Sequence, residues 1–126
     1  MPSLATILVV DDEAEVRTLV SRVLEMNGYR ALTAASGADA LEIWDKSECR
    51  IDLLLTDLVM PDAIGGRELA GLLLAKKPGL KVIFTTGYIS SHPSQNAPPV
   101  EQFTLLQKPY AMTELLAVIQ AKLAEP

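Results

Sequence analysis

Short apolar runs alternate along this chain with segments in which apolar residues recur at three- and four-residue spacing. The short runs predict buried strands, and the spaced segments predict amphipathic helices. Strands are expected at 6–10, 29–34, 52–56, 81–86 and 104–107. Strands and helices in regular alternation indicate βα units, which form a parallel sheet with helices on both faces. The expected fold class is therefore α/β, doubly wound, with five βα units.

The ends of the predicted helices are marked by residues that start or stop helices. The first helix ends at Asn27–Gly28, and Ser36 can cap the second. The third helix ends before Pro78 and is expected to turn three leucines toward the core: Leu69, Leu72 and Leu73. Segment 90–102 contains three prolines, and an interior proline costs a helix about 3 kcal/mol. A fourth helix in this segment is therefore expected to be short or irregular.

The composition fits one globular domain over residues 1–126. Of the 126 residues, 49% are hydrophobic and 21% are charged, which is sufficient for a buried core. Eleven Lys and Arg stand against 16 Asp and Glu, a net charge of −5, and the basic residues are scattered. Direct nucleic-acid binding is therefore not expected. Nothing in the composition decides the oligomeric state.

The sequence shows neither a secretory signal nor a membrane span. The N-terminus has no basic start followed by a long apolar stretch, and no apolar run approaches the roughly 20 residues that cross a bilayer. Cys49 is the one cysteine, so no internal disulfide is expected. We therefore expect a soluble, cytoplasmic chain that makes no contact with a membrane.

Acidic residues and a lysine follow three of the predicted strands. Asp11 and Asp12 follow the first strand, Asp57 the third and Lys108 the fifth. A doubly wound sheet binds its ligand at the carboxyl ends of its strands, so these side chains meet if the strands are neighbours. Mg²⁺ is typically held by one or two carboxylates, by waters and by substrate phosphate. The pattern therefore predicts a divalent-cation site beside a phosphoryl site.

A carboxylate can also be the nucleophile of phosphoryl transfer and form an aspartyl phosphate. Asp57 is the best candidate for that role. Thr86 supplies a hydroxyl at the end of the fourth strand and Lys108 supplies an ammonium, and both groups suit phosphoryl oxygens. The Lys108–Pro109 bond is expected to be cis. Asp11 has a second interpretation, in which it merely caps the first helix.

Four segments, taken together, resemble the receiver domain of two-component response regulators: ILVVDDE, LLLTDLVMPD, FTTGY and LLQKPY. The last two forms are most similar to receivers attached to hybrid histidine kinases. The resemblance covers essentially the whole chain and implies a flavodoxin-like (βα)5 fold with the sheet order 2-1-3-4-5. It also implies a phosphorelay protein that switches or relays a phosphoryl group and is not a turnover enzyme.

The resemblance implies a role for individual residues of the predicted site. Asp57 is the implied phosphoacceptor, and the implied donor is a phosphohistidine of a histidine kinase or of a histidine phosphotransfer domain. Mg²⁺, or Mn²⁺ in its place, is the implied cofactor. Asp12 is its direct ligand and Asp11 assists, and Asp57 and the backbone carbonyl of Val59 are the further implied ligands. Thr86 and Lys108 match the family's switch hydroxyl and phosphate-pairing lysine.

Three positions bear on how the domain works after phosphorylation. Leu105 stands where receivers usually carry Tyr or Phe, so the aromatic movement that commonly reports phosphorylation is not expected here. In receivers, the positions of Val59 and Tyr88 flank the path of the hydrolytic water. An apolar and a bulky aromatic side chain there predict slow loss of the phosphoryl group.

Three other functions compete with that of a receiver. An aspartate-dependent phosphatase places a second Asp two residues after its nucleophile, where this chain has Val59. A nucleotide-binding flavodoxin-like protein needs a glycine-rich or Ser/Thr-rich phosphate loop after the first strand, and the acids there would repel the anion. A phosphorylation-independent interaction module of the same fold stays open, because Leu105 and the proline-containing segment are unusual.

Overall fold

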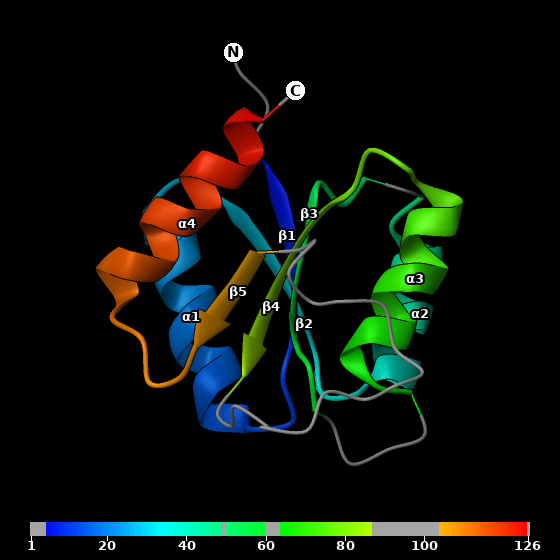
Figure 1. Cartoon of the computed structure of the whole chain (residues 1–126), viewed down its shortest axis with the longest axis horizontal. Helices are drawn as coiled ribbons and strands as arrows, with labels where there is room; N and C mark the ends of the chain where they lie inside the picture. The colour runs from blue at the N-terminus through cyan, green and yellow to red at the C-terminus, as the bar shows by residue number, and fades with distance from the viewer. Residues whose placement is uncertain (1–4, 49, 60–63, 87–103, 126) are drawn as a thin grey trace.

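A computed structural model describes residues 5–48, 50–59, 64–86 and 104–125 of the chain. These residues form a sheet with helices packed on both of its faces (Figure 1). The elements in chain order are β1 (Thr6–Val10), α1 (Ala14–Met26), β2 (Arg30–Ala34), α2 (Gly37–Lys46), β3 (Leu53–Asp57), α3 (Gly66–Lys76), β4 (Lys81–Thr86), β5 (Thr104–Gln107) and α4 (Met112–Ala124).

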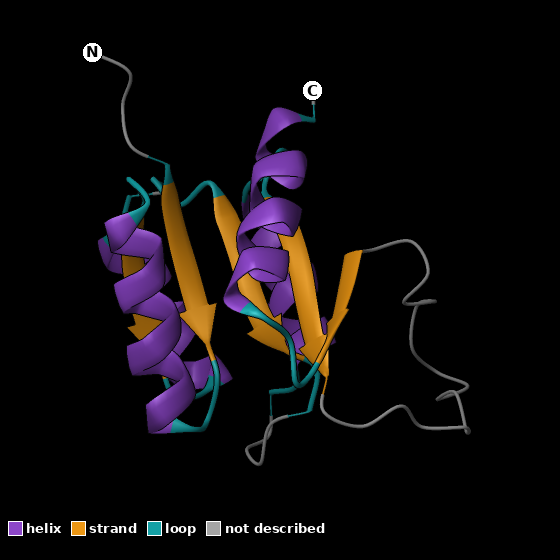
Figure 2. Cartoon of the chain, turned by 90° about the vertical axis from the view of Figure 1, so that its left-hand side faces the viewer, coloured by secondary structure: helices purple, strands orange, loops and turns teal. Residues whose placement is uncertain are grey.

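The sheet has the order β2-β1-β3-β4-β5, and every neighbouring pair of strands is parallel. This is the order that the family resemblance implies. The five predicted strands are confirmed with ends that agree to within one residue. Because all strands are parallel, their carboxyl ends lie along one edge of the sheet, where the predicted site residues follow. Figure 2 shows the strand arrows pointing toward this edge.

Two hydrophobic cores lie on opposite faces of the sheet. One core packs α2 and α3 against Leu8, Leu54 and Phe84, and the other packs α1 and α4 against Ile7 and Leu53. Side chains of a strand alternate between faces, so the three central strands β1, β3 and β4 each contribute to both cores. This burial on both faces explains why the strand sequences are apolar runs and not alternating patterns.

The predicted inward leucines of the third helix are only partly confirmed. Leu69 and Leu73 are fully buried, but Leu72 is 46% exposed, so its predicted inward position was wrong. The buried residues of α3 form a stripe, and at about 100° per residue Leu72 lies roughly 110° from the centre of that stripe. A helix that covers a sheet buries only such a stripe, and Leu72 lies beyond its edge.

The start of α2 follows the prediction from the sequence. The hydroxyl of Ser36 accepts a hydrogen bond from the backbone N–H of Asp39 at 3.1 Å, and the carboxylate of Asp39 accepts one from the N–H of Ala35. The first bond satisfies an N–H group that the first turn of a helix leaves without a partner, and the second joins that turn to the residue before the cap. Trp44, further along α2, is buried in the core as expected.

The expectation of a short or irregular fourth helix falls on segment 87–103, which lies outside the described residues. The same is true of Tyr88. In the described part of the chain, α4 corresponds to the fifth helix that the sequence predicts, and Leu115 and Ile119 on it are fully buried. The Lys108–Pro109 peptide bond is cis, as predicted.

Candidate functional site

Strand alternation brings Asp11, Asp57 and Lys108 to the same side of the sheet. Residues at odd positions of β1 and β3 and at even positions of β5 belong to the core beneath α1 and α4. The three site residues continue these series past or at the strand ends. Their side chains therefore share one face as well as one edge, and they meet.

Lys108 forms ion pairs with both buried carboxylates. Its Nζ lies 2.6 Å from Oδ2 of Asp11 and 3.3 Å from Oδ2 of Asp57, and 3.7 Å from Oε1 of Glu13. The side chain of Lys108 is 16% exposed and that of Asp11 only 4%. A charged group held this far from water is stabilised only by such pairing. The lysine therefore serves as the shared counter-ion of the two acids.

The backbone hydrogen bonds of the sheet extend past the ends of the strands and hold the site residues in place. The N–H of Asp11 donates to the carbonyl of Ala34 at 3.1 Å, and the N–H of Lys108 donates to that of Thr86 at 2.7 Å. The N–H of Leu58, directly after the acid of β3, donates to Thr85 at 2.9 Å. The site is thus built on the ordered edge of the sheet.

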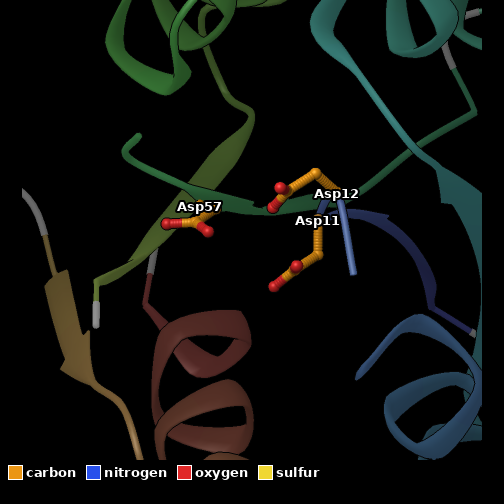
Figure 3. A group of neighbouring side chains, drawn as sticks. All are labelled: Asp11, Asp12 and Asp57. Carbon is orange, nitrogen blue, oxygen red and sulfur yellow. The ribbon is translucent and has the colours of Figure 1, made fainter. Parts of the chain in front are cut away.

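Asp12 completes a group of three acids. One oxygen each from Asp11, Asp12 and Asp57 lie within 4.8 Å of one another, and their carboxylates face a common space (Figure 3). Asp12 is exposed while the other two are buried, so water reaches one side of the group. An all-oxygen donor set with room for water fits Mg²⁺ or Mn²⁺. The residues present are therefore suited to the cofactor that the sequence implies.

Burial and the charges of neighbouring groups shift the pKa values of Asp57 and Lys108. Burial raises the pKa of Asp57 above its ordinary value, Lys108 opposes this, and the charge of Asp11 adds to it. Burial alone would lower the pKa of Lys108, but its hydrogen bond to Asp11 and the charges of Asp57 and Asp11 raise it above its ordinary value. Lys108 therefore stays a cation at neutral pH.

Asp11 also binds the residue that leads into α1, but the N-cap of that helix is Glu13 and not Asp11, as the second interpretation had it. Its Oδ1 accepts a hydrogen bond from the backbone N–H of Glu13 at 2.9 Å, at the start of α1, while its Oδ2 pairs with Lys108. The guanidinium of Arg17 donates to the backbone carbonyl of Asp11 at 2.7 Å. No sequence pattern pointed to this arginine, because a contact between the second turn of a helix and the strand end before it has no fixed spacing.

One protein-family model matches most of the chain. The model described as "Response regulator receiver domain" matches residues 7–120. The chain belongs to this family. The match spans every described element from β1 to most of α4, including the acids and the lysine.

Relatives of this receiver domain occur in chains of very different length. It is 35% identical over 119 residues to the sensor kinase CckA of Brucella abortus, covering 94% of this chain and 12% of that protein. It is 33% identical to the response regulator receiver protein CpdR of the same species, covering 93% of this chain and 95% of that one. The chain thus spans about an eighth of one relative's length and nearly all of another's.

Two further comparisons concern a phosphotransferase and a solved structure. The receiver domain is 31% identical to the sporulation initiation phosphotransferase F of Bacillus subtilis, over 86% of each chain. The structure of the chemotaxis protein CheY4 of Vibrio cholerae matches it with a TM-score of 0.81 and 27% identity, covering 94% of this chain and 98% of that one. The fold is therefore the CheY-type receiver fold, as predicted.

Three further residues singled out in the sequence, Thr86, Val59 and Leu105, differ in how far they are buried. Thr86 is buried at the end of β4, and its backbone carbonyl accepts a hydrogen bond from the backbone N–H of Lys108. Val59 is 71% exposed, and its N–H lies 3.4 Å from Oδ1 of Asp57. Leu105 on β5 is 44% exposed. The predicted roles of the Thr86 hydroxyl and of the Val59 carbonyl stay predictions.

Among the described helices, none combines the length and the apolar composition that crossing a bilayer requires. The cytoplasmic location expected from the sequence stays a prediction. So does the extent of the domain over residues 1–126, of which the family model covers 7–120.

Proposed function

We propose that this receiver domain accepts a phosphoryl group on the carboxylate of Asp57. The proposed donor is a phosphohistidine of a histidine kinase or of a histidine phosphotransfer domain. The observation that carries the proposal is the position of Asp57: it is buried at the carboxyl edge of the sheet, 3.3 Å from the ammonium of Lys108 and beside two further acids. A nucleophile, a cation and an oxygen-rich metal site together are what phosphoryl transfer to a carboxylate requires.

In the proposed reaction, an oxygen of the Asp57 carboxylate attacks phosphorus and the bond from phosphorus to the donor's imidazole nitrogen breaks. The electron pair of that bond stays on the nitrogen, which takes up a proton, and the product is an aspartyl phosphate. Lys108 keeps its positive charge and is placed to pair with a phosphoryl oxygen. Thr86 is the proposed hydroxyl partner of another. The domain makes its own phosphorylated form and is not a turnover enzyme.

Mg²⁺ or Mn²⁺ is the proposed cofactor, held by Asp11, Asp12, Asp57 and the backbone carbonyl of Val59. When bound, the cation supplies positive charge that neutralises phosphoryl oxygens during transfer. Three carboxylates whose oxygens lie within 4.8 Å repel one another, and Lys108 offsets only part of that charge. This excess of negative charge supports the binding of a divalent cation.

The phosphorylated domain either switches a partner or passes the phosphoryl group on. The similarity to a segment of a sensor kinase and to a protein named a phosphotransferase supports the second use. Leu105, in place of the usual aromatic residue, is consistent with a receiver that does not depend on the common aromatic movement. We therefore favour a relay within a two-component phosphorelay.

The test is phosphorylation by acetyl phosphate, followed by intact mass. The native chain and Asp45→Asn, an exposed acid on α2 whose side chain is 70% accessible, are each expected to gain one phosphoryl group when Mg²⁺ is present. Asp57→Asn is expected to gain none, and neither is the native chain in EDTA. If the native chain stayed unmodified by acetyl phosphate and phosphoramidate alike, the phosphorylation-independent interaction module would replace this proposal.

A further inference from the structure

Gly66, the first residue of α3, packs directly on the backbone of the phosphoacceptor. It is buried, and a Cβ atom added to it would overlap the carbonyl oxygen of Asp57. The same atom would lie 3.0 Å from the carbonyl carbon of Asp57 and 3.0 Å from Cα of Leu58. All of these neighbours are backbone atoms, so no side chain can rotate away to make room.

The carbonyl group of Asp57 is also restrained by hydrogen bonds around it. The hydroxyl of Thr56, a fully buried residue, donates to this carbonyl at 3.1 Å. The N–H of Leu58 donates to β4 at 2.9 Å, and the carbonyl of Leu58 accepts from the N–H of Gly66 at 3.1 Å. A group added at Gly66 would therefore have to displace either α3 or the peptide that carries the phosphoacceptor.

The residues just before α3 are close to a second element as well. A Cβ atom added to Gly37, the first residue of α2, would lie 2.7 Å from Cβ of Ile64 and 3.0 Å from its backbone oxygen. The segment 64–66 therefore contacts α2 through one glycine and β3 through another. This close approach on two sides leaves α3 little freedom to retreat from Asp57.

We propose that Gly66 is a positioning residue for phosphoryl transfer. By lacking a side chain, it allows the start of α3 to rest on the Asp57 carbonyl, and this contact, together with the Thr56 hydroxyl, fixes the direction of the Asp57 carboxylate toward Lys108 and the neighbouring acids. The inference rests on the proposed function of Asp57. If so, the rate of transfer depends on the contact of Gly66 with the backbone of Asp57 as well as on the groups that face the carboxylate.

The test compares three Gly→Ala variants of the full chain at saturating Mg²⁺ and acetyl phosphate. Gly66→Ala is expected to slow phosphorylation per folded molecule by about tenfold or more, since small misplacements of a reacting group cost factors of this size. Gly71→Ala, in the same helix with open space around it, is the first control. Gly65→Ala, where the nearest atom is 3.7 Å away, is the second, and both are expected to react at the native rate.

Folded protein is quantified by urea unfolding, because alanine changes the stability of the helix by itself: it favours the helix interior at Gly71 and is disfavoured at the N-cap position of Gly65. A purely structural effect would change the stability and leave the rate per folded molecule unchanged. A Gly66→Ala chain that is folded and reacts as fast as its controls would overturn the inference. If this variant does not fold, Thr56→Val decides: a slower rate supports the inference and a native rate overturns it. A native chain that takes up no phosphoryl group would instead overturn the proposed function and this role with it.

Discussion

At the scale of single residues, the site is governed by the balance of three acids against one lysine. Lys108 contacts Asp11 at 2.6 Å and Asp57 at 3.3 Å, and each of these side chains is at most 16% exposed. Buried charges of one sign are tolerated only when an opposite charge is adjacent. The lysine is therefore expected to matter for stability as well as for phosphoryl transfer.

Replacing Lys108 by methionine is predicted to destabilise the metal-free domain by about 3 kcal/mol, because two buried carboxylates lose their partner. Lys122→Met is the matched control, since Lys122 is similarly buried at 18% and its ion pair among the described residues is with the half-exposed Glu125. The control is expected to lose less than about 1 kcal/mol. Urea unfolding in EDTA measures both. Equal losses of unfolding free energy in the two variants would show that Lys108 is not the counter-ion of Asp11 and Asp57.

Val59 is predicted to prolong the life of the phosphorylated state. It is 71% exposed, next to the phosphoacceptor, and its apolar side chain can neither bind nor orient a hydrolytic water. Val59→Asn is expected to speed the loss of the phosphoryl group several-fold, measured by intact mass over time. Met26→Asn, which changes another exposed apolar residue at the far end of α1, is the control. An unchanged decay in Val59→Asn would contradict the prediction.

At the scale of elements, the strand ends were well predicted and the helix faces less so. The run of residues 53–55 is apolar on both faces because it is buried on both, and the position of Asp57 at the end of this strand can be predicted from the sequence. Leu72 shows the limit, because an apolar residue beside the buried stripe of a helix looks like core in the sequence. The contact of Gly66 with Asp57 depends on how α3 sits on β3, which no local pattern encodes.

The start of α2 offers a prediction about element stability. Ser36→Ala is expected to cost about 1 kcal/mol, because the N–H of Asp39 loses its acceptor. Ser21→Ala is the matched control: Ser21 lies within α1, and its hydroxyl only donates to the carbonyl of Thr18. There alanine is expected to be neutral or slightly stabilising. Urea unfolding separates the two, and a loss in Ser21→Ala equal to that in Ser36→Ala would refute the capping role.

At the scale of the whole molecule, the acids and the ends of the described chain lie at opposite edges of the sheet. β1 begins and α4 ends at the edge away from Asp57 (Figure 1). A segment attached at either end would therefore begin at the edge of the sheet opposite Asp57. This arrangement accords with relatives in which the receiver is 12% of a sensor kinase or 95% of a short protein.

The parallel sheet explains which parts of the site can be predicted from the sequence. A parallel sheet gathers residues that are far apart in the chain at one edge, so the places of Asp11, Asp57 and Lys108 after strands predicted that they meet if the strands are neighbours. The strand order that brings them together was implied by the family resemblance. The geometry behind them was not predictable, because Arg17 and Gly66 act through backbone contacts that leave no motif. Sequence thus identifies the chemical groups, and packing determines their directions.

The most direct test of the central claim is to locate the phosphoryl group chemically. The chain is phosphorylated with acetyl phosphate and Mg²⁺, reduced with borohydride, which converts an acyl phosphate to an alcohol, and sequenced by peptide mass spectrometry. Homoserine is expected at position 57 and at no other acid. Homoserine at Asp11, Asp12 or Asp52 instead, or phosphate on a hydroxyl or histidine with Asp57 intact, would contradict it.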